Sequence, residues 1–286
     1  MANVRTIRRR IRSVQNTAKI TKAMQMIAAS KMRRAQLATM ATRPYAEKMQ
    51  DVLSDLAAQP NESAELHPLL EQREVKRVRL IHITPDRGLC GGLPSNVNRS
   101  AGQFILSQDA SVSVVAVGKK GRDFMARSGQ ELRAVFTDLT DRPKVTDISP
   151  IAFMAVEDYA NEEIDQVYLS YTRFVNTSVQ EAVVERLLPI EPAPLEASQT
   201  VGYIYEPSSF NVLSGLLPRF VEMQIYHATL EAIASEQSAR MVAMRNATEN
   251  ANDLIDDLTL LMNKVRQEVI TKELLDIVGG VAALEG

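Results

Sequence analysis

The chain has 286 residues and a single cysteine, Cys90, so it cannot form an internal disulfide or a metal site built from several cysteines. Seven phenylalanines, seven tyrosines and no tryptophan are few for one compact core of this size. No apolar run reaches the roughly 18 residues of a membrane-spanning helix. The composition therefore favours a reducing compartment and argues against a disulfide-stabilised or membrane-spanning protein.

The N-terminal segment predicts a long helix, because its first 43 residues contain neither glycine nor proline. Its apolar residues recur in alternating steps of three and four, a spacing typical of a left-handed coiled coil. Eight of the ten positions in this series are apolar. The series is Val4, Ile7, Ile11, Val14, Ala18, Thr21, Gln25, Ala28, Met32 and Ala35.

The same segment is strongly basic, with 11 basic residues and no acidic one before Glu47. Three interpretations compete for it. A mitochondrial targeting peptide is rich in arginine, but this amphipathic pattern runs past a cleavable length. A nucleic-acid-binding arm would also be basic, but no motif of a nucleic-acid-binding fold accompanies it. The third interpretation is an ordinary solvated helix face.

The middle of the chain, residues 75–206, holds most of the glycines and prolines and alternates between strand-like and helix-like patterns. This order predicts a small α/β domain of Rossmann-like character. The predicted strands are 75–84, 111–117, 132–136, 165–174, 180–189 and a short one at 201–205. The predicted helices are 95–108, 122–128 and 147–161. Asp147 is a candidate N-cap for the last of these helices, with Pro150 in its first turn.

A glycine-rich turn at 86–93 follows the first predicted strand, where phosphate-binding loops occur. It lacks both the GxGxxG spacing and the lysine and Ser/Thr pair of a P-loop, so a tight turn that needs glycine is the simpler interpretation. Cys90 is a candidate nucleophile, but His67, His82 and His227 all lie far from it in sequence. We therefore expect no catalytic, cofactor-binding or metal site.

The C-terminal segment repeats the helical signal, with neither glycine nor proline from 219 to 278. Thirteen of 16 positions in its three-four series are apolar. The series is Leu216, Phe220, Met223, His227, Leu230, Ala234, Gln237, Met241, Met244, Thr248, Ala251, Ile255, Leu258, Met262, Val265 and Val269. From Phe210 onward the segment carries 11 acidic residues against six arginines and lysines, which complements the basic N-terminal segment.

These patterns predict an α/β domain plus a long antiparallel two-helix coiled coil formed by the N- and C-terminal segments. We expect a coiled-coil helix at 1–74, the Rossmann-like domain at 75–206 and a second coiled-coil helix at 207–286. Gln25, Gln237 and Thr248 interrupt the apolar seam and are candidates for setting its register. The apolar stretch 274–284 is unusual for a chain end in water. It predicts packing either on its own domain or in an apolar ring or groove of another protein.

Four motifs in order along the chain resemble the gamma subunit of F-type ATP synthases. They are ITKAMQMIAASKM at 20–32, TPDRGLCGGL at 84–93, SEQSARMVAMRNATEN at 235–250 and NKVRQEVITKEL at 263–274. The resemblance extends over nearly the whole chain. It implies a non-catalytic central shaft that couples proton-driven rotation of a membrane c-ring to ATP synthesis and hydrolysis in the beta subunits.

The resemblance also implies partners and contact residues. The partners are three alpha and three beta subunits, epsilon and the c-ring, with no cofactor and no nucleic acid. The protein would be peripheral, at the cytoplasmic face of a bacterial cell membrane and attached only through the complex. The implied rotor–stator contacts are Met24, Arg87, Cys90, Arg240, Arg266, Gln267 and Thr271. The implied bearing tip comprises Leu274, Leu275, Ile277, Val278, Val281 and Leu284.

Two other hypotheses make different predictions. An α/β enzyme with a coiled-coil dimerisation arm would bind a nucleotide at residues 88–92. A basic coiled-coil adaptor for nucleic acid or an anionic membrane would bind with an affinity that falls steeply with salt.

Overall fold

The computed structural model describes residues 4–58, 67–191, 206 and 209–285, and these form two compact units. We call Met1–Ala28 with Met241–Gly286 the coiled-coil unit, and Ala29–Arg240 the sheet unit. Two long helices, α1 (Val4–Ala58) and α5 (Ser209–Glu285), contribute to both units. The boundaries expected from sequence, at 74/75 and 206/207, remain a prediction.

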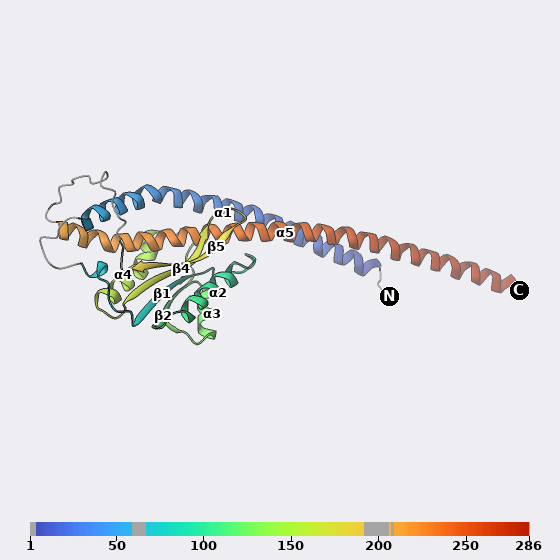
Figure 1. Ribbon diagram of the computed structural model, residues 1–286. Coiled ribbons are helices and arrows are strands. Elements are labelled where there is room, and N and C mark those ends of the chain that lie inside the picture. Colours follow the sequence, from blue (N-terminus) through green and yellow to red (C-terminus); the bar gives the residue numbers. More distant parts are fainter. Residues whose placement is uncertain (1–3, 59–66, 192–205, 207–208, 286) are drawn as a thin grey trace. The chain divides into compact units, whose positions relative to one another are not determined.

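In the coiled-coil unit, α1 and α5 pack along the predicted seam and run in opposite directions (Figure 1). Ile7 and Ile11, near the start of α1, form an apolar cluster with Leu258, whereas Thr21, further along α1, contacts Thr248. The partner's number falls as the number on α1 rises, as it must in an antiparallel pair. The predicted antiparallel coiled coil is therefore confirmed.

Burial along the two helices follows the three-four spacing that the sequence predicts. The predicted seam positions that are buried in the structure are Ile7, Ile11, Ala18, Thr21, Ala28, Ala35, Leu230, Ala234, Gln237, Met244, Ala251 and Leu258. Several of these are alanines, which allow two helix backbones to approach closely. Helix α1 also continues through Pro44, and Met49 and Leu53 beyond it are buried in the core of the sheet unit.

The sheet unit contains a five-stranded sheet in the order β3-β2-β1-β4-β5. Its strands are β1 (Arg77–Ile83), β2 (Ser111–Val117), β3 (Glu131–Phe136), β4 (Gln166–Phe174) and β5 (Gln180–Leu188). The first four are parallel to their neighbours and β5 is antiparallel to β4. This confirms the predicted α/β sheet and its five strands within a residue or two. The sixth expected strand, 201–205, lies outside the described residues.

The helices of this unit are α2 (Leu93–Leu106), α3 (Lys119–Arg127) and α4 (Val145–Ala160), with a short 3-10 helix η1 (Pro68–Leu70) before β1. The expected N-cap of α4 was wrong. Lys144 occupies that position, and Asp147 lies in the first turn, where its carboxylate accepts a hydrogen bond from the backbone N–H of Lys144. Asp147 thus makes one of the two hydrogen bonds of a capping box, from inside the helix.

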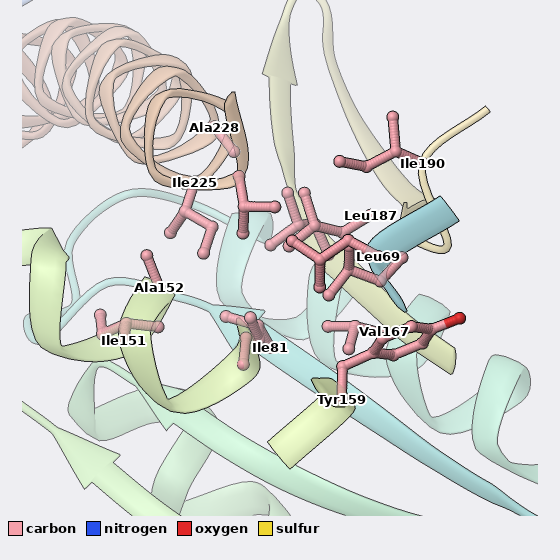
Figure 2. Packing of buried hydrophobic residues seen from close by; sticks show 14 of the residues in the cluster. Leu69, Ile81, Ile151, Ala152, Tyr159, Val167, Leu187, Ile190, Ile225 and Ala228 are labelled. Atoms are coloured by element: carbon pink, nitrogen blue, oxygen red, sulfur yellow. The ribbon is translucent and has the colours of Figure 1, made fainter. Parts of the chain in front are cut away.

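The main core lies between one face of the sheet, α4 and the first part of α5. Figure 2 shows side chains from these elements converging, including Ile81 of β1, Ile151 and Tyr159 of α4, and Ile225 of α5. A smaller cluster on the opposite face joins Leu80 and Val114 to α2 and α3. The Rossmann-like sheet is therefore covered on both faces, as a parallel sheet requires.

Helix α5 begins earlier than its glycine- and proline-free stretch suggests, and it includes Gly215 and Pro218. The reason is tertiary packing. In this part of α5 a second apolar face is buried against the sheet, in addition to the coiled-coil seam. That face comprises Leu213, Leu217, Val221, Ile225 and Ala228. Burial contributes about 1.5–3 kcal/mol for each large apolar side chain, so together these residues outweigh the roughly 1 kcal/mol cost of a helical glycine and the roughly 3 kcal/mol cost of a helical proline.

Candidate functional site

The loop between β1 and α2 is held at its start by one carboxylate. Asp86 accepts hydrogen bonds from the backbone N–H of Lys119 and from that of Asp138, each at 2.9 Å. These two donors come from the start of α3 and from the segment after β3. The loop that the sequence predicts as a tight turn is therefore fixed to two other segments at the carboxyl edge of the sheet.

Arg240 of α5 holds the centre of the same loop. Its guanidinium donates to the carbonyl oxygen of Gly88 at 3.2 Å and to a carboxylate oxygen of Glu236 at 2.6 Å. Both charged side chains are largely buried, with 12% and 17% exposed. Burial raises the pKa of Glu236, and the cation of Arg240 opposes that rise. Arg240, an expected contact for another subunit, therefore forms an ion pair within its own chain.

Within this loop, Cys90 is buried while its neighbours face outward. Its side chain is 1% exposed, whereas Arg87 is exposed and Leu89 is 64% exposed. Burial raises the pKa of the Cys90 thiol, although the nearby cation of Arg240 lowers it in part. A buried thiol with a raised pKa is a poor nucleophile. The exposed side chains of the loop therefore include those of Arg87 and Leu89, whereas Cys90, an expected contact residue, is buried.

The loop also contains strained backbone. Leu89 has a φ of 63° and Gly91 a φ of 62°, both in the left-handed region. Glycine adopts this conformation freely, whereas leucine does so at a cost. The expected tight turn that needs glycine is confirmed at Gly91. Behind the loop, a cavity of about 60 Å³ is lined by residues that include Thr84, Asp86 and Glu236.

A shallow groove of about 750 Å³ lies along the coiled-coil unit. Its lining mixes apolar residues, among them Ala18, Met26 and Ile255, with polar and charged ones that include Lys19 and Lys22. Both lysines are exposed. Met24, a predicted contact residue, is half-buried on the same helix.

The last part of α5 is exposed throughout the described residues 266–281. The expected contact residues Arg266, Gln267 and Thr271 are all in this stretch and exposed. So are the large apolar residues of the expected tip, each at least half exposed: Leu274, Leu275, Ile277, Val278 and Val281. The side chain of the sixth tip residue, Leu284, lies outside the described part of the chain.

Sequence reasoning located most of these regions but missed the residues that organise the loop. Asp86 is a common turn residue, and its position after a strand was a usable signal. Glu236 lies four residues before Arg240 on a predicted helix, a spacing that favours an ion pair. The contact of Arg240 with Gly88 had no sequence signal, because 152 residues separate the two.

His82 is buried in the sheet unit and is not a catalytic base. Its Nδ1 lies 3.1 Å from the hydroxyl of Ser170, and its Nε2 lies 2.9 Å from Oδ1 of Asn98. Burial lowers its pKa to about 4, so the ring is neutral at pH 7.

In the described parts of the chain no three His, Cys, Asp or Glu side chains gather in a way that could hold a metal ion. No described helix combines the length and apolar character needed to cross a membrane.

Comparison with known proteins places the chain in a family. The family model described as ATP synthase matches residues 3–284. A protein of Dehalococcoides mccartyi named ATP synthase gamma chain is 60% identical over 284 residues, which is 99% of this chain and 100% of the relative. Gamma chains of Roseiflexus castenholzii and Herpetosiphon aurantiacus are 54% and 53% identical, each match covering 99% of both proteins. The chain belongs to the ATP synthase gamma-chain family.

Solved structures agree with this assignment. A chain of the Tetrahymena thermophila mitochondrial ATP synthase, from a structure of the central stalk and c-ring, is 27% identical with a TM-score of 0.61. The match covers 80% of this chain and 99% of that one. A chain of the Euglena gracilis mitochondrial enzyme, at 19% identity and a TM-score of 0.67 over 98% and 94% of the two chains, shares the fold. As a gamma chain, this protein is a non-catalytic subunit of the central stalk rotor.

Proposed function

We propose that this gamma chain is the rotating shaft that couples turning of a membrane c-ring to ATP synthesis and hydrolysis in beta subunits. The observation that carries the proposal is a two-helix coiled coil in which one helix continues alone as an exposed apolar tip. A shaft must transmit torque along its length and turn freely at its end. The two parts of the coiled-coil unit suit these two tasks.

Torque transmission is supported by the seam between α1 and α5. Its buried alanines bring the helices close together, and the hydrogen bond between Thr21 and Thr248 joins them across the seam at 2.7 Å. Closely packed helices resist sliding, because each side chain lies in a hole formed by the other helix.

Free turning is supported by the change in pattern near the end of α5. Continued past Val269, the three-four series reaches Lys272 and Asp276, which are both charged, so the seam pattern ends there. The apolar residues from Leu274 onward lie on another face of the helix and cover about half of its circumference. Apolar attraction depends little on direction, so this face can keep contact with an apolar sleeve at every angle.

We propose that this sleeve is formed by three alpha and three beta subunits. Arg266, Gln267 and Thr271 would contact a loop of the catalytic subunits just before the tip. Met24, and the groove on the same helix that Lys19 and Lys22 help to line, would meet an acidic loop of beta. Charge complementarity would bring these surfaces together quickly and in the right orientation.

We further propose that the sheet unit binds epsilon and the c-ring, with no role for nucleic acid. The protein would then lie at the cytoplasmic face of a bacterial cell membrane and be held there only through the complex. The loop at 84–92 would contribute Arg87 to the contact with the catalytic subunits.

The test is co-expression with alpha and beta subunits, followed by purification through a tag on beta. We expect the chain to co-purify and an attached bead to turn when ATP is added. A chain that stays separate at physiological salt would contradict the proposal. If it instead bound nucleic acid or anionic vesicles with a steep salt dependence, the adaptor hypothesis would replace it.

A further inference from the structure

The loop between β1 and α2 lies against α5 through a side chain with little freedom. The guanidinium of Arg240 joins the carbonyl of Gly88 to the carboxylate of Glu236, and its side chain is 12% exposed. Both hydrogen bonds use the same terminal nitrogen, Nη2, and because the side chain is 12% exposed, little of the guanidinium is open to another protein. Its contacts are therefore better suited to positioning the loop than to binding a partner directly.

The backbone of the loop is strained at Leu89, and the contact with Arg240 helps to hold it in that conformation. Leu89 adopts a left-handed φ of 63° while its side chain is 64% exposed. An exposed side chain gains little from packing, so the conformation must be held by contacts of neighbouring residues. Asp86 holds one end of the loop, and the start of α2 at Leu93, which is buried, holds the other. Arg240 acts between these two points.

We infer that Arg240 is a positioning residue, which clamps the loop in the closed form that buries Cys90 and presents Arg87 and Leu89. This rests on the proposed function in one respect, because the presented residues are expected to contact the catalytic subunits. Arg240 then affects coupling through the loop and not through its own charge on a partner. Loss of the clamp lets the loop open.

Opening of the loop can be measured through Cys90, because its thiol becomes accessible to a reagent only when the loop opens. It is the one cysteine of the chain, and its thiol is 1% exposed in the closed loop. The rate of its reaction with N-ethylmaleimide in the folded full-length chain therefore measures how often the loop opens. We expect Arg240→Gln to react roughly tenfold to a hundredfold faster, the range for losing a hydrogen bond to a charged group.

Thiol chemistry alone would change the rate in the opposite direction. The Arg240 cation lowers the pKa of Cys90, so its removal reduces the thiolate fraction and slows labelling of an equally accessible thiol. Arg240→Lys keeps the charge but not the planar fork, and we expect an intermediate rate. Glu236→Gln removes a carboxylate that raises the pKa of Cys90, so it should accelerate labelling a few-fold through the thiol as well as through the weaker orientation of Arg240.

Arg245→Gln is the matched control. Arg245 is on the same helix and pairs with Glu249 four residues away, as Arg240 pairs with Glu236, but both residues of this pair are exposed. Labelling at the wild-type rate in Arg240→Gln, or equal acceleration in Arg245→Gln, would overturn the inference. If Arg240→Gln fails to fold, the Arg240→Lys rate decides in its place, because this variant keeps the charge beside Cys90, and an unchanged rate would reject the clamp.

A second arm uses the complex with alpha and beta subunits. If Arg240 acts through the loop, Arg240→Gln and Arg87→Gln should have non-additive effects on coupling between rotation and ATP turnover. Additive effects would mean that Arg240 contacts the partner directly. Because labelling needs no partner, a chain that fails to assemble would reject the proposed function while leaving the clamp supported by its own measurement.

Discussion

The hydroxyl oxygens of Thr21 on α1 and Thr248 on α5 lie 2.7 Å apart, at a step of the coiled-coil seam where Thr21 is buried and Thr248 is half-buried. Each is also within reach of a carbonyl on its own helix, that of Ala18 or that of Met244. A hydroxyl has one hydrogen, so one threonine donates across the seam while the other donates along its helix. The pair therefore joins the helices and leaves no donor unused.

Replacing one of these threonines should destabilise the coiled coil modestly. Thr21→Val keeps the side-chain shape but removes the cross-helix hydrogen bond, and we expect a loss of about 1 kcal/mol in the free energy of unfolding. Thr248→Val should cost a similar amount. The double variant should lose less stability than the sum of the two single variants, because the shared hydrogen bond can be lost only once. Urea unfolding of the four proteins gives the coupling energy, and a value near zero would contradict the role of this pair.

The buried His82 makes the stability of the sheet unit depend on pH. Its pKa is lowered from 6.5 to about 4 by burial, so the unfolded chain binds a proton more readily than the folded one. The stability from the neutral ring is present above pH 6.5 and lost as the pH falls towards 4. Between pH 7 and pH 5 this amounts to about 2 kcal/mol, to order of magnitude.

The measurement compares urea midpoints of the wild type and His82→Gln at several pH values. The variant should be less stable at pH 7 but should lose less stability on acidification. His67→Gln is the control. Burial lowers the pKa of His67 as well, but this histidine is only half-buried, so its replacement should change the pH slope less than His82→Gln does. Identical pH slopes for the wild type and His82→Gln would show that His82 does not carry this dependence.

The sequence predicts the coiled coil well because its signal repeats over many turns. One misleading residue such as Gln237 changes little in such a series, and Gln237 is itself buried at its predicted seam position. Strands such as β2 are also well predicted, because β-branched runs bounded by turn residues have few other conformations. Both signals are local and repeated along the chain.

The remaining features depend on contacts that no local pattern encodes. Helix α5 includes Pro218 because the sheet buries Leu217 and Val221 beside it. The clamp of Arg240 on Gly88 depends on where the sheet places a loop 152 residues away. Sequence reasoning therefore gave the surfaces on which the candidate contacts lie, but not which of those side chains are already engaged within the chain.

A buried ion pair in the sheet unit gives a third prediction. Arg79 of β1 lies 2.9 Å from Asp158 of α4, and their side chains are 6% and 7% exposed. Asp158→Ala leaves a buried guanidinium without its carboxylate, and we expect a loss of roughly 3–5 kcal/mol in the free energy of unfolding. Arg133→Ala removes a half-exposed second partner of Asp158 at 3.4 Å and should cost under about 1 kcal/mol.

Variants of the same pair test whether the loss of stability in Asp158→Ala arises from the unpaired charge of Arg79. Replacing both residues, as Arg79→Met with Asp158→Leu, should recover most of the lost stability, because two apolar side chains need no partner. Thermal and urea unfolding of the three variants provides the comparison. A double variant as unstable as Asp158→Ala would show that packing, and not charge, sets the cost.

Substitutions in the exposed tip of α5 should impair assembly with the alpha and beta subunits without destabilising the free chain. Leu274 and Val278 are four residues apart on one face of the helix and are 58% and 64% exposed. Replacing both with glutamate should change the free energy of unfolding of the chain by less than about 0.5 kcal/mol, because neither is buried. In the complex, where we propose that an apolar sleeve surrounds them, it should lower affinity for the alpha and beta subunits at least about tenfold.

Asp276→Asn is the matched control, since Asp276 lies between these two residues in sequence but on the opposite side of the helix. It should leave both stability and assembly unchanged, because that side needs no apolar contact. The affinity is measured by titrating tagged alpha–beta assemblies with each chain. If the double glutamate variant binds as tightly as the wild type, the apolar face is not a bearing surface. If it unfolds the free chain, the tip packs on the chain itself, which is the alternative that the sequence left open.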